Sequence, residues 1–133
     1  MKVETSLHFN GQCEAAFKFY EQRLGGKLEF LLKWGESPLA GQVPPEWQDK
    51  VVHARLKLGG ADLLGGDVLP RDYRQPQGFS VMLGMNDPRT AEQTFAALAD
   101  GGSIKMPLQK TFWAPLYGFV VDRFGIPWEV NCE

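Results

Sequence analysis

Hydrophobic and polar residues alternate over the first nine positions of the chain, with Leu7 and Phe9 on one parity and His8 on the other. An alternation of period two predicts a β-strand with one buried face. After Asn10-Gly11 the apolar residues recur at spacings of three and four, which is the repeat of a helix buried along one side. Gly25-Gly26 then supplies the left-handed residue at which helices commonly end. The chain therefore begins with a strand followed by a helix.

The second half of the chain repeats this order. Residues 79–85 alternate as a strand, and Asp87 followed by Pro88 is a typical helix start. Gly101-Gly102 ends this second helix. A shift of 76 residues places Gly25-Gly26 on Gly101-Gly102. The pattern indicates an internal repeat.

Three strand-like segments follow each helix. In chain order they span residues 27–34, 50–58, 61–66, 104–109, 116–122 and 126–132. Each half is thus predicted to be a β-α-β-β-β module, and the fold class is α+β. We expect a single domain over 1–133, with module one at 1–66, a linker at 67–78 and module two at 79–133. Residues 35–49 form a loop of a length that often marks a lid or a mobile segment.

Composition and charge argue against several classes of partner. Apolar residues make up 44% and charged residues 23% of the 133 positions, the balance of an ordinary globular domain. The formal net charge of −2 and the absence of a basic stripe argue against nucleic-acid binding. No apolar run approaches membrane-spanning length, so no membrane partner is expected. Cys13 and Cys132 fit buried positions without metal-ligand spacing, and we expect a reducing, cytoplasmic setting.

Polar side chains opposite the apolar faces of strands are candidates for function. Glu129 takes the polar parity of the last strand, where a carboxylate is costly to bury unless it meets water, a partner or a metal. His8 likewise lies opposite the apolar face of its strand, the first of the chain. On another strand His53 could serve as a general base and Arg55 could bind an anionic ligand. The alternative for these two is a solvated or intersubunit strand face.

Aromatic residues gather just before the closing strands, at Phe112, Trp113 and Tyr117. Such a cluster could form a stacking wall for a planar ligand, because ligand pockets are mostly apolar. It could equally belong to the core or to a dimer interface, where aromatic residues are enriched. The chain has no Ser-His-Asp order, P-loop or dinucleotide fingerprint. The residues alone therefore name no reaction.

Four segments together resemble a known family. They are LHFNGQCEAAFKFY at 7–20, HARL at 53–56, TFWA at 111–114 and DRFGIPWEVN at 122–131. The chain resembles the PhnB-like proteins of the vicinal oxygen chelate superfamily, which includes glyoxalase I, bleomycin-resistance proteins and extradiol dioxygenases. The resemblance implies two modules whose mixed sheets curve around a cavity, a small-molecule ligand in that cavity, and a homodimer.

The resemblance also implies which residues would hold a metal. Ligands in this superfamily typically come from the first and last strands of the modules, and His8 and Glu129 match two such positions. The other two positions fall on Leu64 and Gly84, which offer no metal ligand. Two protein ligands are fewer than the three typical of a catalytic zinc site.

Two hypotheses follow from the resemblance. The first is a protein that binds a small molecule in the cavity without a complete metal centre, using His53, Arg55, Trp113 and Tyr117. The alternative is a metal-dependent lyase, isomerase or dioxygenase acting on a small oxygenated substrate. In that case His8 and Glu129 would hold a divalent ion, and Glu129 would be the candidate catalytic base.

Overall fold

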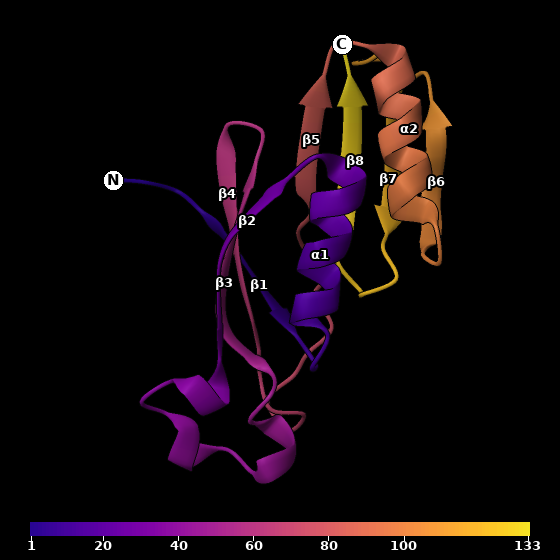
Figure 1. Cartoon of the computed structure of the whole chain (residues 1–133). Coiled ribbons are helices and arrows are strands. Elements are labelled where there is room, and N and C mark those ends of the chain that lie inside the picture. The colour runs from indigo at the N-terminus through magenta and orange to yellow at the C-terminus, as the bar shows by residue number, and fades with distance from the viewer. The chain divides into compact units, whose positions relative to one another are not determined.

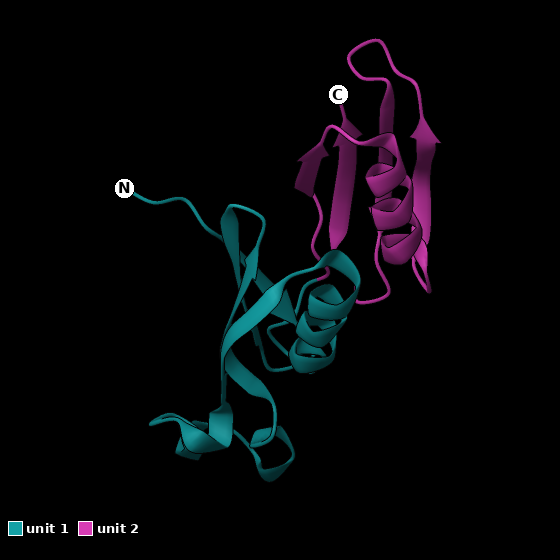
Figure 2. Cartoon of the chain, turned by 45° about the horizontal axis from the view of Figure 1, so that its top comes forward, with its two compact units in different colours: residues 1–74 teal, residues 75–133 magenta.

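The structure, a computed structural model, describes all residues from 1 to 133. The chain forms two compact units, Met1–Arg74 and Gln75–Glu133, here called unit 1 and unit 2 (Figure 2). The boundary between them falls inside the predicted linker 67–78. Each unit holds one four-stranded mixed sheet and one α-helix (Figure 1).

Unit 1 has the predicted β-α-β-β-β order. Its elements are β1 (Thr5–Phe9), α1 (Cys13–Leu24), β2 (Lys27–Lys33), β3 (Val51–Leu58) and β4 (Ala61–Asp67). The strand order is β1-β4-β3-β2, in which β1 runs parallel to β4 and the other pairs are antiparallel. The long loop between β2 and β3 folds into three short 3-10 helices, Trp34–Glu36, Ala40–Gln42 and Pro45–Trp47. Trp47 is buried, which ties this loop to the rest of unit 1.

Unit 2 repeats the same order. Its elements are β5 (Val81–Met85), α2 (Pro88–Ala99), β6 (Ser103–Gln109), β7 (Leu116–Val121) and β8 (Pro127–Cys132). The strand order is β5-β8-β7-β6, again with one parallel pair, β5 with β8. The α+β class with two similar modules is therefore confirmed. Neither α-helix of the chain is long and apolar enough to cross a membrane.

The first strand of each unit begins later in the chain than the alternation predicts. β1 begins at Thr5 and β5 at Val81, leaving Val3 and Phe79 exposed. The pairing of β1 with β4 begins only at Thr5 opposite Leu63, and the pairing of β5 with β8 begins only at Val81 opposite Trp128. The alternation in the sequence therefore extends beyond the residues that pair in the sheet.

The ends of the helices follow the predicted chemistry. The Asp87 carboxylate accepts a hydrogen bond from the Arg89 backbone N–H at the start of α2. Gly25 ends α1 in the left-handed conformation at φ 76°. The buried Asp67 carboxylate accepts from the backbone N–H groups of Cys13 and Val51, at 3.0 and 2.9 Å, and so joins the start of α1 to β3. Burial raises the pKa of Asp67 above its usual value.

Candidate functional site

The sheet of unit 2 has one face packed on α2 and one face that carries polar groups. Gly118 of β7 lies against Phe95 of α2, and its register partner on β8, Val130, is fully buried. Glu129 precedes Val130 and therefore points to the opposite face, where it is half-buried. Its register partners on that face are Met82 of β5 and Phe119 of β7. The parity predicted for Glu129 is thus found in the structure.

Two neutral hydroxyl groups hold the Glu129 carboxylate. The Ser80 hydroxyl donates to Oε2 and the Tyr117 hydroxyl donates to Oε1. No ion pair joins Glu129 to a basic side chain. Each carboxylate oxygen can accept more than one hydrogen bond, so the group retains acceptor capacity beyond these two contacts. Ser80 was missed from the sequence, although it shares the parity of Met82 and so belongs to the same face of the strand segment.

Tyr117 is buried beneath this carboxylate. Burial raises the pKa of Tyr117 to about 12, and the hydrogen bond to Glu129 and the charge of Glu129 act in the same direction. The protonated phenol is therefore the stable form over the whole physiological range, and its O–H remains a donor to Glu129.

The tyrosine titration tests this arrangement. In E129Q we expect the pKa of Tyr117 to fall from about 12 toward the ordinary 10.0, without reaching it because burial remains. Because the pKa of Tyr117 is higher in the folded protein than in the unfolded chain, its protonation favours the folded state. This contribution to stability is fully present below about pH 10 and is lost as the pH rises through about 12. Tyrosinate absorbance, with Y117F to assign the transition, measures the shift. Exposed Glu133, changed to Gln, is the matched control, and an unchanged Tyr117 transition in E129Q would contradict the assignment.

An aromatic wall stands beside Tyr117. The Trp113 ring meets the Tyr117 ring edge to face at 5.0 Å, and Phe112 meets Trp113 at 4.7 Å. Trp113 is 51% exposed and Phe112 is 97% exposed, so both present ring surface to solvent. Here "aromatic wall" means Phe112 and Trp113. The aromatic cluster predicted from the sequence is therefore formed, with Tyr117 as its buried member.

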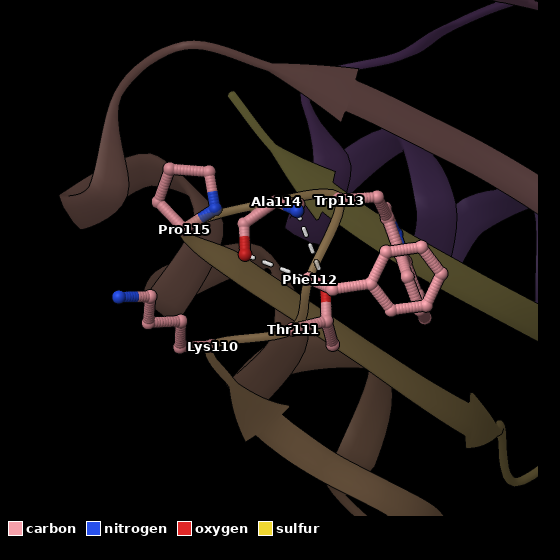
Figure 3. A pocket seen from close by; sticks show the side chains of 6 residues that line it. All are labelled: Lys110, Thr111, Phe112, Trp113, Ala114 and Pro115. Atoms are coloured by element: carbon pink, nitrogen blue, oxygen red, sulfur yellow. Dashed lines mark hydrogen bonds between the residues drawn. The ribbon is translucent and has the colours of Figure 1, made fainter.

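The loop that carries the aromatic wall is closed by its own hydrogen bonds. The Thr111 N–H donates to the Ala114 carbonyl at 3.0 Å, and the Ala114 N–H donates to the Thr111 hydroxyl at 3.2 Å (Figure 3). Residues 110–115 line an open hollow of about 480 Å³. Figure 3 shows the rings of Phe112 and Trp113 on one side of this loop and the Lys110 side chain on the other.

Unit 1 carries the remaining predicted residues on one face of its sheet. His8 is exposed on β1, opposite the buried Leu7 and Phe9. His53 is exposed on β3, and its ring lies 5.7 Å from the ring of Phe30 on β2. Both histidines thus have the polar parity predicted for them. Nothing in unit 1 places a carboxylate or a thiol with them as a metal site.

Arg55 of β3 is already engaged by two carboxylates. Its Nη1 lies 2.7 Å from Glu4 Oε2 and 2.5 Å from Asp62 Oδ2. The hydrogen bond with Arg55 is the largest cause that lowers the pKa of both Glu4 and Asp62. An anionic ligand at Arg55 would have to compete with this pair, and anion binding there stays a prediction.

The structure thus brings together only part of the predicted set. Trp113, Tyr117 and Glu129 form one group within unit 2. His8 and Glu129, the two predicted metal ligands, belong to different units, so neither unit by itself holds the pair.

Fold and site together define a small α+β protein of two similar β-α-β-β-β units, with a half-buried carboxylate on the sheet of unit 2 and exposed aromatic rings in the loop before β7. The chain belongs to the Glyoxalase/Bleomycin resistance protein/Dioxygenase superfamily, whose family model matches residues 7–130. The resemblance seen in the sequence is confirmed.

Individual relatives extend over nearly the whole chain. Protein YjdN of Escherichia coli (strain K12) is 32% identical over 139 aligned positions, covering 98% of this chain and 95% of YjdN. The crystal structure of protein PA1353 from Pseudomonas aeruginosa is 45% identical with a TM-score of 0.91, covering 100% of this chain and 98% of that one. A PhnB protein from Bacillus cereus shares the fold, with a TM-score of 0.85 at 22% identity and full coverage of both chains.

Proposed function

We propose that this protein binds a small organic molecule on the polar sheet face of unit 2, with Glu129 as the central acceptor and the aromatic wall as a flanking surface. One observation carries the proposal. A half-buried carboxylate is held only by neutral hydroxyls and lies next to a tyrosine packed against an exposed tryptophan. Few polar groups set among aromatic surface are the usual composition of a ligand site.

The donor set does not fit the divalent metal that membership of the superfamily suggests. Within either unit, no group of three or more His, Cys, Asp or Glu side chains lies together as metal ligands. In unit 2 both oxygens of Glu129 already accept hydrogen bonds, and the position on the first strand, β5, at which a ligand is expected is Gly84, opposite Asn131. In unit 1 the position on the last strand, β4, at which a ligand is expected is Leu64. Metal-assisted chemistry therefore has no support from these residues, and we propose binding rather than a reaction.

Tryptophan fluorescence tests the proposed function. The chain has four tryptophans, and we expect a planar aromatic ligand to change the emission of the wild type but not of W113F, whose other three tryptophans serve as an internal reference. E129Q should weaken binding about tenfold or more, because a charge-assisted hydrogen bond is lost. A library of planar aromatic metabolites that leaves the emission flat would contradict the proposal.

Metal analysis provides the opposing test. The metal hypothesis predicts an ion that survives dialysis and is lost in both His8→Ala and E129Q. Our proposal predicts that wild type and these two variants show the same low metal content. Stoichiometric metal in the wild type that disappears in both variants would overturn the metal-free proposal.

The homodimer and the binding roles of His53 and Arg55 stay predictions. Light scattering of the purified chain tests the first. If His53 binds the ligand found by fluorescence, H53A should weaken its binding. An unchanged affinity would assign that histidine to a solvated strand face, as its exposure suggests.

A further inference from the structure

The polar face of unit 2 presents a carboxylate that no basic side chain pairs with. The Glu129 carboxylate is half-buried and receives hydrogen bonds only from the neutral hydroxyls of Ser80 and Tyr117. Burial of a charge is costly unless an opposite charge or several hydrogen bonds compensate it. A cationic ligand would supply the missing charge and use the acceptor capacity that the two hydroxyls leave.

A second unsatisfied acceptor lies two residues further along the same strand. The side-chain oxygen of Asn131 is buried and has no hydrogen-bond partner. Asn131 has the same parity as Glu129 on β8, so both side chains are on the face opposite α2. A buried acceptor without a donor costs about 1–3 kcal/mol, and a ligand N–H would recover this loss once the Asn131 side chain turns to expose its oxygen, which is covered in the free protein.

Open space lies beside that acceptor. The register partner of Asn131 on β5 is Gly84, and a Cβ atom placed on Gly84 would meet nothing within 4 Å. Tyr117 is the partner of Asn131 on the other side, on β7. A flat group therefore has room above Gly84, on β5 beside Asn131.

The neighbouring aromatic surface favours the same kind of ligand. Ring faces attract cations and stack on planar groups. Trp113 packs on Tyr117, whose hydroxyl binds Glu129, and the one basic residue that lines the loop hollow, Lys110, extends away from the two exposed rings (Figure 3). Carboxylate, amide oxygen and aromatic rings are all complementary to positive charge.

We infer that the ligand of this site is a compact planar cation with N–H donors, such as an amidinium, a guanidinium or a protonated aminoheterocycle. Its donors bind Glu129 and Asn131 together. This inference rests on the proposed function and adds the chemical class of the ligand. The site is expected to select cations over neutral or anionic analogues of the same shape, because only a cation neutralises the charge of the Glu129 carboxylate.

Three probes of nearly the same shape test the inference: benzamidine as the cation, benzamide as the neutral analogue and benzoate as the anion. Heteronuclear NMR of the full chain reports on the Trp113 indole N–H and on the side-chain amide of Asn131. We expect benzamidine to shift both signals and to bind at least tenfold more tightly than benzamide, with no binding of benzoate.

Variants assign the binding to the two acceptors. E129Q and Asn131→Leu should each weaken benzamidine about tenfold, and Gly84→Val should block it by filling the open space. Glu133→Gln makes the same chemical change at an exposed residue near the end of the same strand and should have no effect. The spectra themselves show whether each variant is folded.

The outcomes separate the inference from the proposed function. Equal or tighter binding of benzamide or benzoate that still depends on Trp113 and Glu129 would overturn the cationic class and leave the proposed function intact. Binding of Zn²⁺ or Mn²⁺ at Glu129 without any response to benzamidine would overturn both. No response to any of the three probes would overturn the inference, while the fluorescence screen would still decide the proposed function.

Discussion

Replacing Asp122 with alanine is expected to lower the free energy of unfolding by about 3 kcal/mol or more. Asp122 is buried in the turn between β7 and β8. Its Oδ1 accepts from the backbone N–H groups of Phe124 and Ile126, at 2.8 and 3.0 Å, and its Oδ2 accepts from the Trp128 indole at 2.9 Å. Alanine would leave these donors without this partner, and each buried donor left unsatisfied costs about 1–3 kcal/mol.

Two further variants show which of the three bonds matters. D122N keeps one oxygen for the backbone N–H groups but turns an amide N–H₂ toward the Trp128 indole N–H, so we expect an intermediate loss. Trp128→Phe removes the indole donor, and in the double variant the penalty of D122N should shrink, giving a measurable coupling energy. Urea denaturation followed by circular dichroism and by hydrogen exchange of unit 2 measures these differences. A D122A loss below about 1 kcal/mol would contradict the assignment.

This turn also explains why residues 122–131, one of the segments that carry the family resemblance, hold both structural and site residues. Asp122 and Trp128 stabilise the hairpin on its buried side. Glu129 and Asn131 lie on the opposite face of the same strand. The hairpin sets the register that brings Tyr117 opposite Asn131 and close to Glu129. The segment therefore identifies the fold, and only its alternate positions belong to the candidate site.

The elements of the fold could be predicted because their signals are local. Period-two alternation, helical spacing and the cap at Asp87 each depend on residues within a few positions of one another, and all three are found in the structure. The prediction was wrong where an element depends on a distant strand. Val3 and Phe79 continue the alternation in sequence yet lie outside β1 and β5, because no neighbouring strand pairs with them.

For the candidate site, the sequence predicted the face of the sheet on which each side chain lies but not the residues with which it forms hydrogen bonds. Parity correctly placed Glu129 on the polar face, but its hydrogen bond to Ser80 requires the parallel pairing of β5 with β8, across 49 residues of chain. Likewise the polar parity of Arg55 was correct, while its ion pair with Glu4 spans 51 residues. A period of two says which side a residue faces and nothing about which strand lies beside it.

Gly118→Ala is expected to be the second strongly destabilising change, with a loss of about 2–3 kcal/mol. Gly118 lies on the helix-facing side of β7, and a Cβ atom there would be 2.5 Å from Cε1 of the Phe95 ring on α2. Phe95 is buried, so its ring cannot move aside without displacing the core. Gly65 repeats this contact in unit 1, where a Cβ would be 2.6 Å from Cζ of Phe17.

Gly84→Ala is the matched control, because it adds the same methyl group to the same sheet at a position with nothing within 4 Å. We expect its free energy of unfolding to stay within about 1 kcal/mol of the wild type or to rise slightly, since alanine restricts the unfolded chain. Combining G118A with Phe95→Leu should recover part of the loss by removing the clashing ring edge. Equal effects of G118A and G84A would contradict the close approach of β7 to α2. The two glycines differ because they lie on opposite faces of the sheet. Gly118 allows α2 to pack closely on one face, and Gly84 leaves space on the other face, where we place the ligand.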